Sequence, residues 1–412
     1  MTGTAVTGAA GAAVAPSGDQ APPAVVGLCG AGCPGDEISQ LDARSAIQRR
    51  EAIERLLGGP VPVHATLRTA GGQLLASPAA AVLPLLADPW AQASLFRRTP
   101  CIHNVDDPSF EPGPAESLRW LGGAWADGLL PGPDEFTVLP GPGDSSYAYL
   151  PRSRVMVRTA GPAAVYREAG QVRLVLPGRG TVTLSGETRT LGAGPHADGH
   201  VEVLPETDGR PVFNAIPLFG RISRVRQAGR DETRRGIPVI EEGLDLLGRA
   251  WPAMHSLVDR WVRGFVVIAY EGCARSHTSI YAPHVVMLSC ESPLAVAEAL
   301  CHETSHGRLF AFAAHHDLLA DSHTARHDSP WRPDRRPLVS FLHGIHAFVA
   351  VCEFYRRLAD ADSSCQSVAE QVVARQAPRI VTAWDYLQSQ ARWTPDGQRV
   401  ASALAPFVEG LR

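Results

Sequence analysis

The sequence predicts an α+β protein, in which a mainly helical C-terminal domain follows a β-rich insertion or N-terminal region. Two patterns predict this class. Residues 154–218 alternate β-branched with polar residues between Gly, Pro and Asp breaks, as antiparallel strands do. Residues 235–412 carry apolar side chains at helical spacing instead. The length of 412 residues also exceeds what one hydrophobic core usually supports, so we expect two domains or one large, elaborated domain.

The part of the chain before the C-terminal domain is expected to hold a tail, a region of short helices and a set of strands. Residues 1–35 are rich in Ala, Gly and Pro, show no period and predict a flexible tail. Residues 36–150 predict helices and loops, and residues 151–220 a β-rich segment, an antiparallel meander or small sandwich. Within the helical and loop region, helices are expected at 36–57, 79–86 and 91–96, and loops at 105–145 with at most a short helix at 115–125.

The C-terminal domain, residues 235–412, is expected to place helices around short buried strands. Residues 240–262 have the spacing of a long amphipathic helix that is interrupted at Pro252. The runs FVVIA at 265–269 and VVML at 285–288 indicate buried strands, because they are short, β-branched and uninterrupted by charge.

Two further helices follow these strands. The first is expected to start at Ser292-Pro293, because Ser favours the N-cap and Pro the first helical position, and to run to residue 320. The second opens at Pro337 and has an apolar body that continues past residue 349. These two helices carry the candidate functional residues.

Composition argues against several classes of protein. A net charge of -4 argues against general nucleic-acid binding, and no run approaches the roughly 20 apolar residues of a membrane span. The N-terminus lacks the basic and apolar regions of a secretory signal, and the eight cysteines form no CxxC pair. We therefore expect a cytoplasmic protein with reduced thiols. The chain has no lysine, so every cationic role other than that of histidine falls to arginine.

Histidines are concentrated in one part of the chain. Eight of the 15 histidines lie between His302 and His346. If the histidines were spread evenly along the chain, about two of them would fall in this stretch. The first two of the eight belong to an HExxH motif, His302-Glu303-Thr304-Ser305-His306. On a helix, residues i and i+4 project from one face, so these two imidazoles can bind one metal ion. Glu303 lies close enough to be a base, a hydrogen-bond partner of a ligand, or a third ligand.

The residues after the motif limit the choice of a third ligand. The metzincin continuation His-x-x-Gly-x-x-His is absent, and no Glu occurs between Glu303 and Glu353, which disfavours a thermolysin-like arrangement. His343 and His346 instead share a face of the following apolar helix. We expect His343 to be the third ligand, with His346 as the second choice and a carboxylate such as Asp317 or Glu353 as the third.

Three arginines stand directly before the His343 helix. Arg332, Arg335 and Arg336 resemble an anion-binding set, because a guanidinium group binds a carboxylate through two hydrogen bonds. Ordinary surface charge is the alternative interpretation of the same residues.

At residues 240–360 the sequence resembles the HExxH-motif proteins of peptide natural-product gene clusters, which are described as 2-oxoglutarate-dependent peptide β-hydroxylases. The resemblance depends on a segment with Ser276, Thr278 and Ser279 and on three longer blocks. These blocks are PHVVMLSCESPLAVAEAL, CHETSHGRLF and SPWRPDRRPLVSFLHGIHAF. At the residue before the second strand, the chain has His284 where the family has glycine.

The resemblance implies a non-haem Fe(II) dioxygenase that uses 2-oxoglutarate and O2 to hydroxylate a side-chain β-carbon of a ribosomally made precursor peptide. Three protein ligands leave about three positions on an octahedral iron for the oxo-acid and O2. Carried onto this chain, the resemblance implies His302, His306 and His343 as iron ligands, Glu303 as the catalytic carboxylate, and Arg336, Arg332, Ser276 and Thr278 as cofactor-binding residues, with Arg336 favoured for the distal carboxylate of 2-oxoglutarate.

Two other functions remain open. A site of three histidines also suits zinc, so a zinc-dependent metallopeptidase with Glu303 as general base is the first alternative. A non-catalytic partner in peptide maturation is the second. The β-rich segment could pair with an extended peptide in each of these cases.

Overall fold

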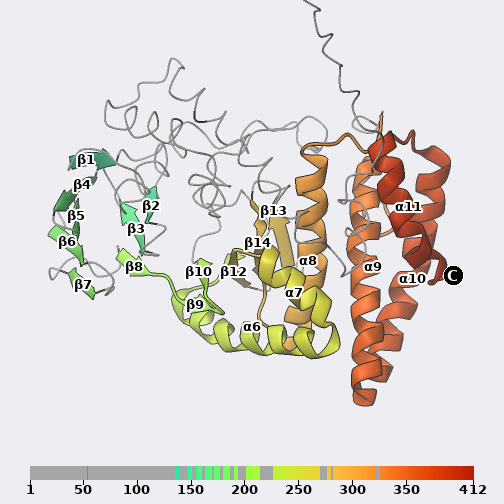
Figure 1. Ribbon diagram of the computed structural model, residues 1–412, viewed down its shortest axis with the longest axis horizontal. Helices are drawn as coiled ribbons and strands as arrows, with labels where there is room; N and C mark the ends of the chain where they lie inside the picture. The colour runs from blue at the N-terminus through green and yellow to red at the C-terminus, as the bar shows by residue number, and fades with distance from the viewer. Residues whose placement is uncertain are drawn as a thin grey trace, which may run out of the picture.

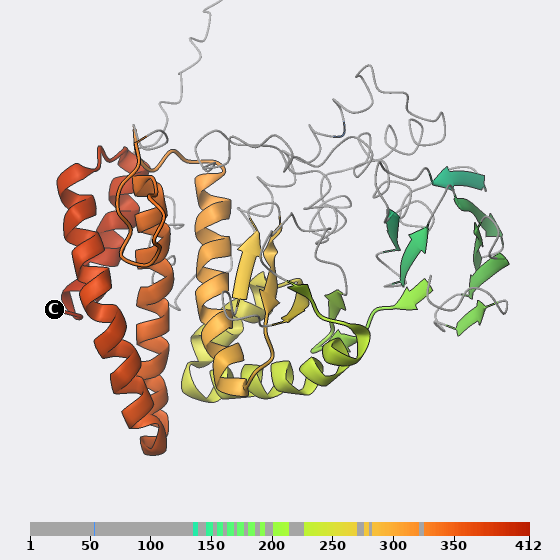
Figure 2. The same cartoon turned by 180° about the vertical axis from the view of Figure 1, so that it is seen from behind.

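The computed structural model describes residues 53, 201–213, 226–269, 276–279, 282–320 and 325–412, together with the strands between residues 135 and 193. The chain is helix-rich there, at 65% helical, and includes a small mixed sheet, which confirms the α+β class. Helices and the mixed sheet form one body, and two smaller sheets lie at the far end from the C-terminal helices (Figures 1 and 2).

The mixed sheet consists of short strands in the order β13-β14-β12-β10-β9, with β11 paired to β12. β10, β12 and β14 are mutually parallel, whereas β9, β11 and β13 run antiparallel to their neighbours. Every residue of β14 is buried, as expected for a strand covered on both faces. The bounds are β9 (Glu206–Thr207), β10 (Arg210–Phe213), β11 (Arg226–Gln227), β12 (Gly264–Ala269), β13 (Ser276–Ser279) and β14 (Ala282–Leu288).

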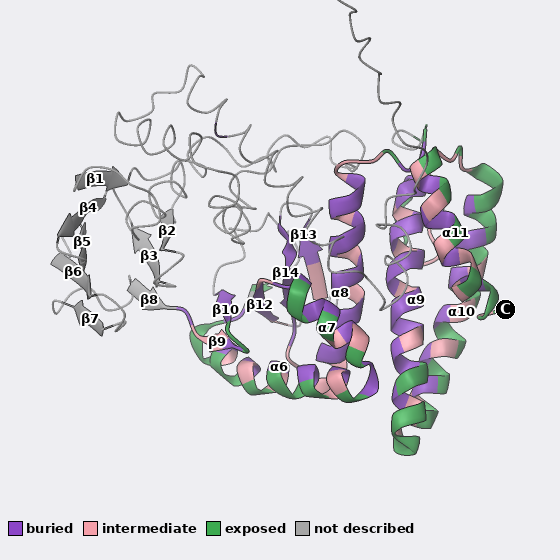
Figure 3. Cartoon of the chain, in the orientation of Figure 1, coloured by how far each residue is buried: buried purple, intermediate pink, exposed green. Residues whose placement is uncertain are grey.

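The helices form a layer beside this sheet (Figures 1 and 3). α8 lies between the sheet and α9, and its sheet-facing and α9-facing sides are both buried, as Figure 3 shows. α9 packs against α10 on its other side. The helices are α6 (Arg230–Ala250), α7 (Pro252–Trp261), α8 (Pro293–Ala313), α9 (Leu338–Ala361), α10 (Gln366–Gln390) and α11 (Pro395–Glu409), with a single 3-10 turn, η3 (Ser363–Cys365), between α9 and α10.

Most of the elements expected in the C-terminal domain are confirmed. The strands at 265–269 and 285–288 are β12 and β14, and the helix break expected at Pro252 separates α6 from α7. α6 begins earlier than expected, because the Gly229 N–H donates to the Glu232 carboxylate at 2.7 Å and caps the helix.

α8 starts at the expected residue but ends before the residue expected from the sequence. The Ser292 hydroxyl accepts a hydrogen bond from the backbone N–H of Ala295 at 3.2 Å. The extension of this helix to residue 320 is wrong, because α8 ends at Ala313. The chain then turns, and His316 bonds to Asp396 of α11 at 2.8 Å. A tertiary contact therefore replaces the last predicted turns.

The strands N-terminal to residue 204 form two antiparallel sheets. The alternating pattern predicted those that follow residue 154, whereas the two strands at 135–138 and 146–150 lie in the region 36–150, where helices and loops were expected. One sheet has the order β1-β4-β5-β6-β7 and the other β2-β3-β8. Their members are β1 (Glu135–Val138), β2 (Ser146–Leu150), β3 (Val155–Thr159), β4 (Ala163–Glu168), β5 (Gln171–Leu176), β6 (Gly180–Ser185), β7 (Thr190–Ala193) and β8 (Val201–Val203).

The limits expected for the β-rich segment need correction at both ends. Loops were expected throughout 105–145, but β1 is a strand and pairs with β4, so the Pro and Gly residues around it mark its ends. At the other end, β9 and β10 belong to the mixed sheet, because β10 pairs with β12 about 50 residues later in the chain. Of the elements expected within 1–125, the structure describes only Ile53, which is helical and fully buried; the tail and the other helices lie outside the described residues.

α9 is the most apolar helix in the part of the chain that the structure describes. It is long and apolar enough to cross a membrane, contrary to the expectation from composition. However, 83% of its apolar stretch is buried inside the protein, between α8 and α10. This burial is typical of a core helix, and it places the residues of α9 that face α8 away from solvent.

Candidate metal centre

The two histidines of the HExxH motif point their Nε2 atoms at one place. These atoms lie 3.0 Å apart, and the His302 and His306 rings meet edge to face with centroids 4.6 Å apart. Two nitrogen ligands at about 2.1 Å from one metal ion and at right angles to each other are about 3 Å apart. The imidazoles are therefore spaced as two neighbouring ligands of a single ion.

His343 brings a third imidazole to this place from α9. Its ring centroid lies 6.0 Å from that of His306 and 4.5 Å from the ring of Phe310. The side chain is buried, and its Nδ1 has no hydrogen-bond partner among the described residues. A buried polar atom without a partner costs about 1–3 kcal/mol, which a metal ligand bond or a bound polar group would offset.

In this structure the three rings do not surround a single point at which one metal ion could bind. Among the described residues, no three His, Cys, Asp or Glu side chains are close enough together to hold a metal ion as they stand. The donor set nevertheless fits a metal in its chemistry, with two nitrogens at ligand spacing and a third ring beside them. A three-histidine site would require the His343 ring to turn toward His302 and His306.

The imidazoles of this cluster are held neutral. Burial lowers the pKa of His302 to about 4 and that of His343 to about 3. The pKa of His306 is lowered well below its ordinary value, first by burial and then by the charge that the neighbouring histidines carry when they are protonated. A neutral imidazole keeps the lone pair that a metal needs. The groups whose charge acts on His306 are His302, His343, His346 and His277, so that five histidines form one cluster.

His277 is the member of this cluster that the sequence analysis missed. It is half-buried on β13, and burial followed by the positive charge of Arg332 lowers its pKa to about 4. Its neighbours Ser276 and Thr278 were singled out for their hydroxyls, but nothing in the spacing connected a histidine on a strand with HExxH on a helix. The pairing of β13 with β14 and its packing on α8 create that connection.

Ser276 and Thr278 lie against Glu303. The Ser276 hydroxyl donates to Glu303 Oε1 at 2.7 Å, and the Thr278 hydroxyl donates to the backbone carbonyl of Glu303 at 3.2 Å. Burial raises the pKa of the Glu303 carboxyl to about 7, and these hydroxyls oppose the rise. The two residues expected at a cofactor therefore hold the carboxylate of the motif, which titrates near neutral pH and can accept or release a proton.

The other candidates for a third ligand lie in different surroundings. His346 is buried on α9, and its charge acts on both His306 and His343. Glu353 accepts a hydrogen bond from Arg357 one turn further along α9, at 2.8 Å. Asp317 is exposed beyond the end of α8. Neither carboxylate is among the groups that act on the cluster, so His346 is the alternative to His343.

A series of aromatic ring contacts connects the loop that carries the three arginines to the histidines. Trp331 stacks on Phe348 with centroids 5.4 Å apart, and Phe348 meets the edge of His302 at 4.8 Å. Gly344 makes this approach possible, because a Cβ at this position would lie 2.8 Å from the Trp331 ring. The loop is thereby fixed one residue before Arg332.

The arginines of this loop have different environments. Arg332 is exposed, and its charge acts on His277 of the cluster. Arg336 instead binds Asp334 at 2.6 Å, while its backbone forms a bridge with His327. Arg335 pairs with Asp328 at 3.3 Å on the surface. Of the three, Arg332 is therefore the one that forms no ion pair with a described residue and whose charge helps to lower the pKa of His277.

α8 is seated on the sheet by a close contact beside His306. The Trp261 indole donates to the backbone carbonyl of Pro283 at 3.0 Å, and a Cβ on Gly307 would lie 2.2 Å from the same oxygen. His284 is buried beneath the Trp261 ring and bonds to the Trp261 carbonyl through Nδ1 at 2.8 Å. His284 therefore takes part in packing rather than in the histidine cluster.

No protein-family model matches the sequence, and no curated protein is significantly similar to it.

Proposed function

We propose that this protein is a non-haem Fe(II)- and 2-oxoglutarate-dependent dioxygenase that hydroxylates a side-chain β-carbon of a ribosomally made peptide. The observation that carries the proposal is the 3.0 Å separation of the His302 and His306 Nε2 atoms, with the buried ring of His343 beside them. These neutral imidazoles supply up to three nitrogen ligands. The choice of iron over other metals depends on the family resemblance of residues 240–360.

In this proposal the three histidines hold the metal, and bound Fe(II) supplies the O2-dependent oxidation of the peptide. The balance is that 2-oxoglutarate, O2 and the peptide C–H give succinate, CO2 and the peptide C–OH. Glu303 stays beside the metal site because Ser276 holds its carboxylate. With a pKa near 7, Glu303 can hold or release the proton of a bound water or substrate group at neutral pH.

The co-substrate carboxylate is assigned to Arg332 in preference to Arg336. The charge of Arg332 acts on His277, whereas Arg336 would first have to leave Asp334. Replacing Arg332 with Gln should raise the KM for 2-oxoglutarate about tenfold or more, since a charge-assisted pair contributes about 1.5–3 kcal/mol. Arg336→Gln is the matched control and should change the KM little; the reverse order would return the assignment to Arg336.

The peptide is assigned to the edge of the mixed sheet. Among the described strands β13 has a neighbour on one side only, and it lies against the HExxH residue Glu303. An extended peptide can add to such an edge through its backbone. It would then pass close to His277 and the metal ligands.

The proposal is tested by succinate formation from 2-oxoglutarate. Purified protein supplied with Fe(II), O2 and the precursor peptide should form succinate and add one oxygen atom to the peptide. His302→Ala should abolish both products. His343→Ala should lose iron while His346→Ala retains it, and the opposite result would make His346 the ligand. Absence of succinate with iron and peptide both bound would refute the activity and favour a non-catalytic role in peptide maturation.

A zinc-dependent peptidase is the second candidate, and the raised pKa of Glu303 favours it. A carboxylate that titrates near pH 7 is suited to act as general base toward a metal-bound water. This function requires stoichiometric zinc and peptide cleavage without oxygen. Cleavage under anaerobic conditions that is lost in Glu303→Gln would establish it in place of the dioxygenase.

A further inference from the structure

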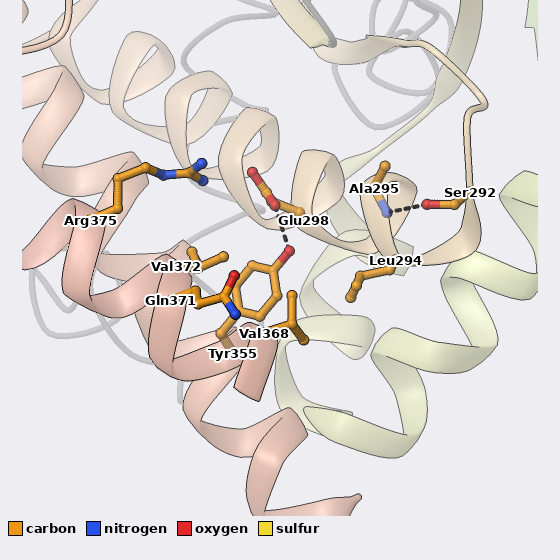
Figure 4. A pocket seen from close by; sticks show the side chains of 9 residues that line it. All are labelled: Ser292, Leu294, Ala295, Glu298, Tyr355, Val368, Gln371, Val372 and Arg375. Carbon is orange, nitrogen blue, oxygen red and sulfur yellow. Dashed lines mark hydrogen bonds between the residues drawn. The ribbon is translucent and has the colours of Figure 1, made fainter. Parts of the chain in front are cut away.

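A separate cavity lies between α8, α9 and α10, at the N-terminal end of α8 (Figure 4). It encloses about 270 Å³ and is partly open to solvent. That volume is enough for several ordered waters or for one small organic molecule. Its walls combine charged, polar and aliphatic side chains from all three helices: Ser292, Leu294, Ala295, Glu298, Tyr355, Val368, Gln371, Val372 and Arg375.

One wall holds a carboxylate in a fixed position. The Tyr355 hydroxyl donates to Glu298 Oε2 at 2.6 Å, and the Tyr355 side chain is buried, so the pair has little freedom (Figure 4). Glu298 forms no ion pair with a described residue, which leaves its charge and its second oxygen available to a cationic group.

The opposite wall holds a guanidinium group that has no counter-ion. Arg375 extends from α10 across the opening toward Glu298 (Figure 4). It forms neither an ion pair nor a hydrogen bond with any described residue, and no ion pair joins it to Glu298. A free guanidinium presents a planar fork of N–H donors that fits a carboxylate. The cavity thus has separate sites for a positive and a negative group.

Part of the remaining lining is apolar. Leu294 and the two valines of α10, Val368 and Val372, are the aliphatic lining residues. Ala295 leaves space one turn before Glu298 on the same face of α8, where a larger side chain would occupy the cavity. An aliphatic group of modest size therefore has a place to pack between the two charges.

We propose that this cavity binds a free α-amino acid with an aliphatic side chain. Its carboxylate pairs with Arg375, its ammonium group with the Glu298–Tyr355 pair, and its side chain packs on Leu294, Val368 and Val372. Leucine is the probe, because it carries both charges and a branched aliphatic side chain that can pack on these three residues. The site needs no metal, so the proposal stands independently of the dioxygenase.

The position of the cavity connects it to the histidine cluster. Glu298 lies one turn before His302 on the same face of α8, and Tyr355 follows Phe348, the residue in contact with the His302 ring, by two turns on α9. A bound amino acid would therefore restrain α8 and α9 together. The restraint would act next to the ring contact between Phe348 and His302, which lies between the cavity and the histidine cluster.

The test is isothermal titration of the full-length, metal-free protein with leucine. Saturable binding is expected, with leucinamide and N-acetyl-leucine each bound at least tenfold more weakly, because each lacks one of the two charges. Leucinamide and N-acetyl-leucine binding as tightly as leucine, or leucine failing to bind at millimolar concentration, would overturn the proposal. Tight binding of N-acetyl-leucine alone would identify the end of a peptide as the ligand and would equally overturn it.

Two variants on one helix provide the matched comparison. Arg375→Gln should weaken leucine binding about tenfold or more and leave leucinamide binding unchanged. Arg379→Gln removes an equally exposed arginine one turn further along α10, outside the cavity, and should leave both ligands unaffected. If both substitutions weakened leucine binding equally, Arg375 would act only through the general surface charge, and the proposed site would be refuted. Thermal unfolding without ligand verifies that both variants are folded.

Discussion

Replacing Gly307 with Ala tests how the HExxH helix is seated on the sheet. The added Cβ would lie 2.2 Å from the backbone oxygen of Pro283 and 3.0 Å from the indole nitrogen of Trp261. It would have to move by about 1 Å to reach ordinary van der Waals contact. Because the Pro283 oxygen belongs to the strand backbone, α8 itself must shift, and it carries His306 with it.

The expected cost follows from three contributions. Overpacking of a closely packed interior costs about 1–3 kcal/mol, and the bond from Trp261 to the Pro283 carbonyl contributes about 1 kcal/mol that a shift would weaken. Alanine favours the helix over glycine by about 1 kcal/mol. The free energy of unfolding should therefore fall by about 1–3 kcal/mol. Metal affinity should fall as well, because ligand distances tolerate a change of only about 0.2 Å.

The assay is chemical denaturation of the metal-free protein, followed by titration with Fe(II) and Zn(II). Gly248→Ala is the matched control, because its Cβ on α6 would meet His255 of α7 at 3.5 Å, an ordinary van der Waals contact. The control should gain up to about 1 kcal/mol and bind metal normally. If Gly307→Ala proved as stable as Gly248→Ala and bound metal as tightly, the close packing of α8 on β14 would be refuted.

Two further predictions concern protons at the histidine cluster. The free energy of unfolding of the metal-free protein should fall as the pH is lowered from about 6.5 to 4: unfolded histidines take up protons below about 6.5, whereas folded His302 and His343 remain neutral down to about 4 and 3. Glu303, with its pKa raised to about 7, offsets part of this fall, so the comparison between variants is decisive. His302→Ala should give a shallower slope, and an unchanged slope would contradict the burial of the His302 ring. Ser276→Ala should cost about 1.5–3 kcal/mol at pH 8, where Glu303 is charged, and less at pH 5, because the carboxyl with a pKa of about 7 is then protonated. Equal losses at both pH values would mean that the hydroxyl does not bond to the charged carboxylate.

Local patterns predicted most elements of the C-terminal domain, because each depends on residues adjacent in sequence. The N-cap Ser292, the break at Pro252 and the buried strands β12 and β14 all lie where sequence rules place them. Long-range contacts decided the rest. β10 leaves the β-rich segment because its partner is β12, and α8 ends early where His316 bonds to Asp396. No local pattern encodes either partner.

The sequence by itself determined which residues stand one helical turn apart, and hence that His302 and His306 face the same way. The tertiary structure decided what surrounds them. It brought His277 to the cluster from a strand, turned Ser276 and Thr278 onto Glu303, and occupied Arg336 with Asp334. The physical reason is that spacing along a helix fixes directions within one element. The approach of a second element depends on how both bury their apolar faces, as Gly307 and Gly344 permit here.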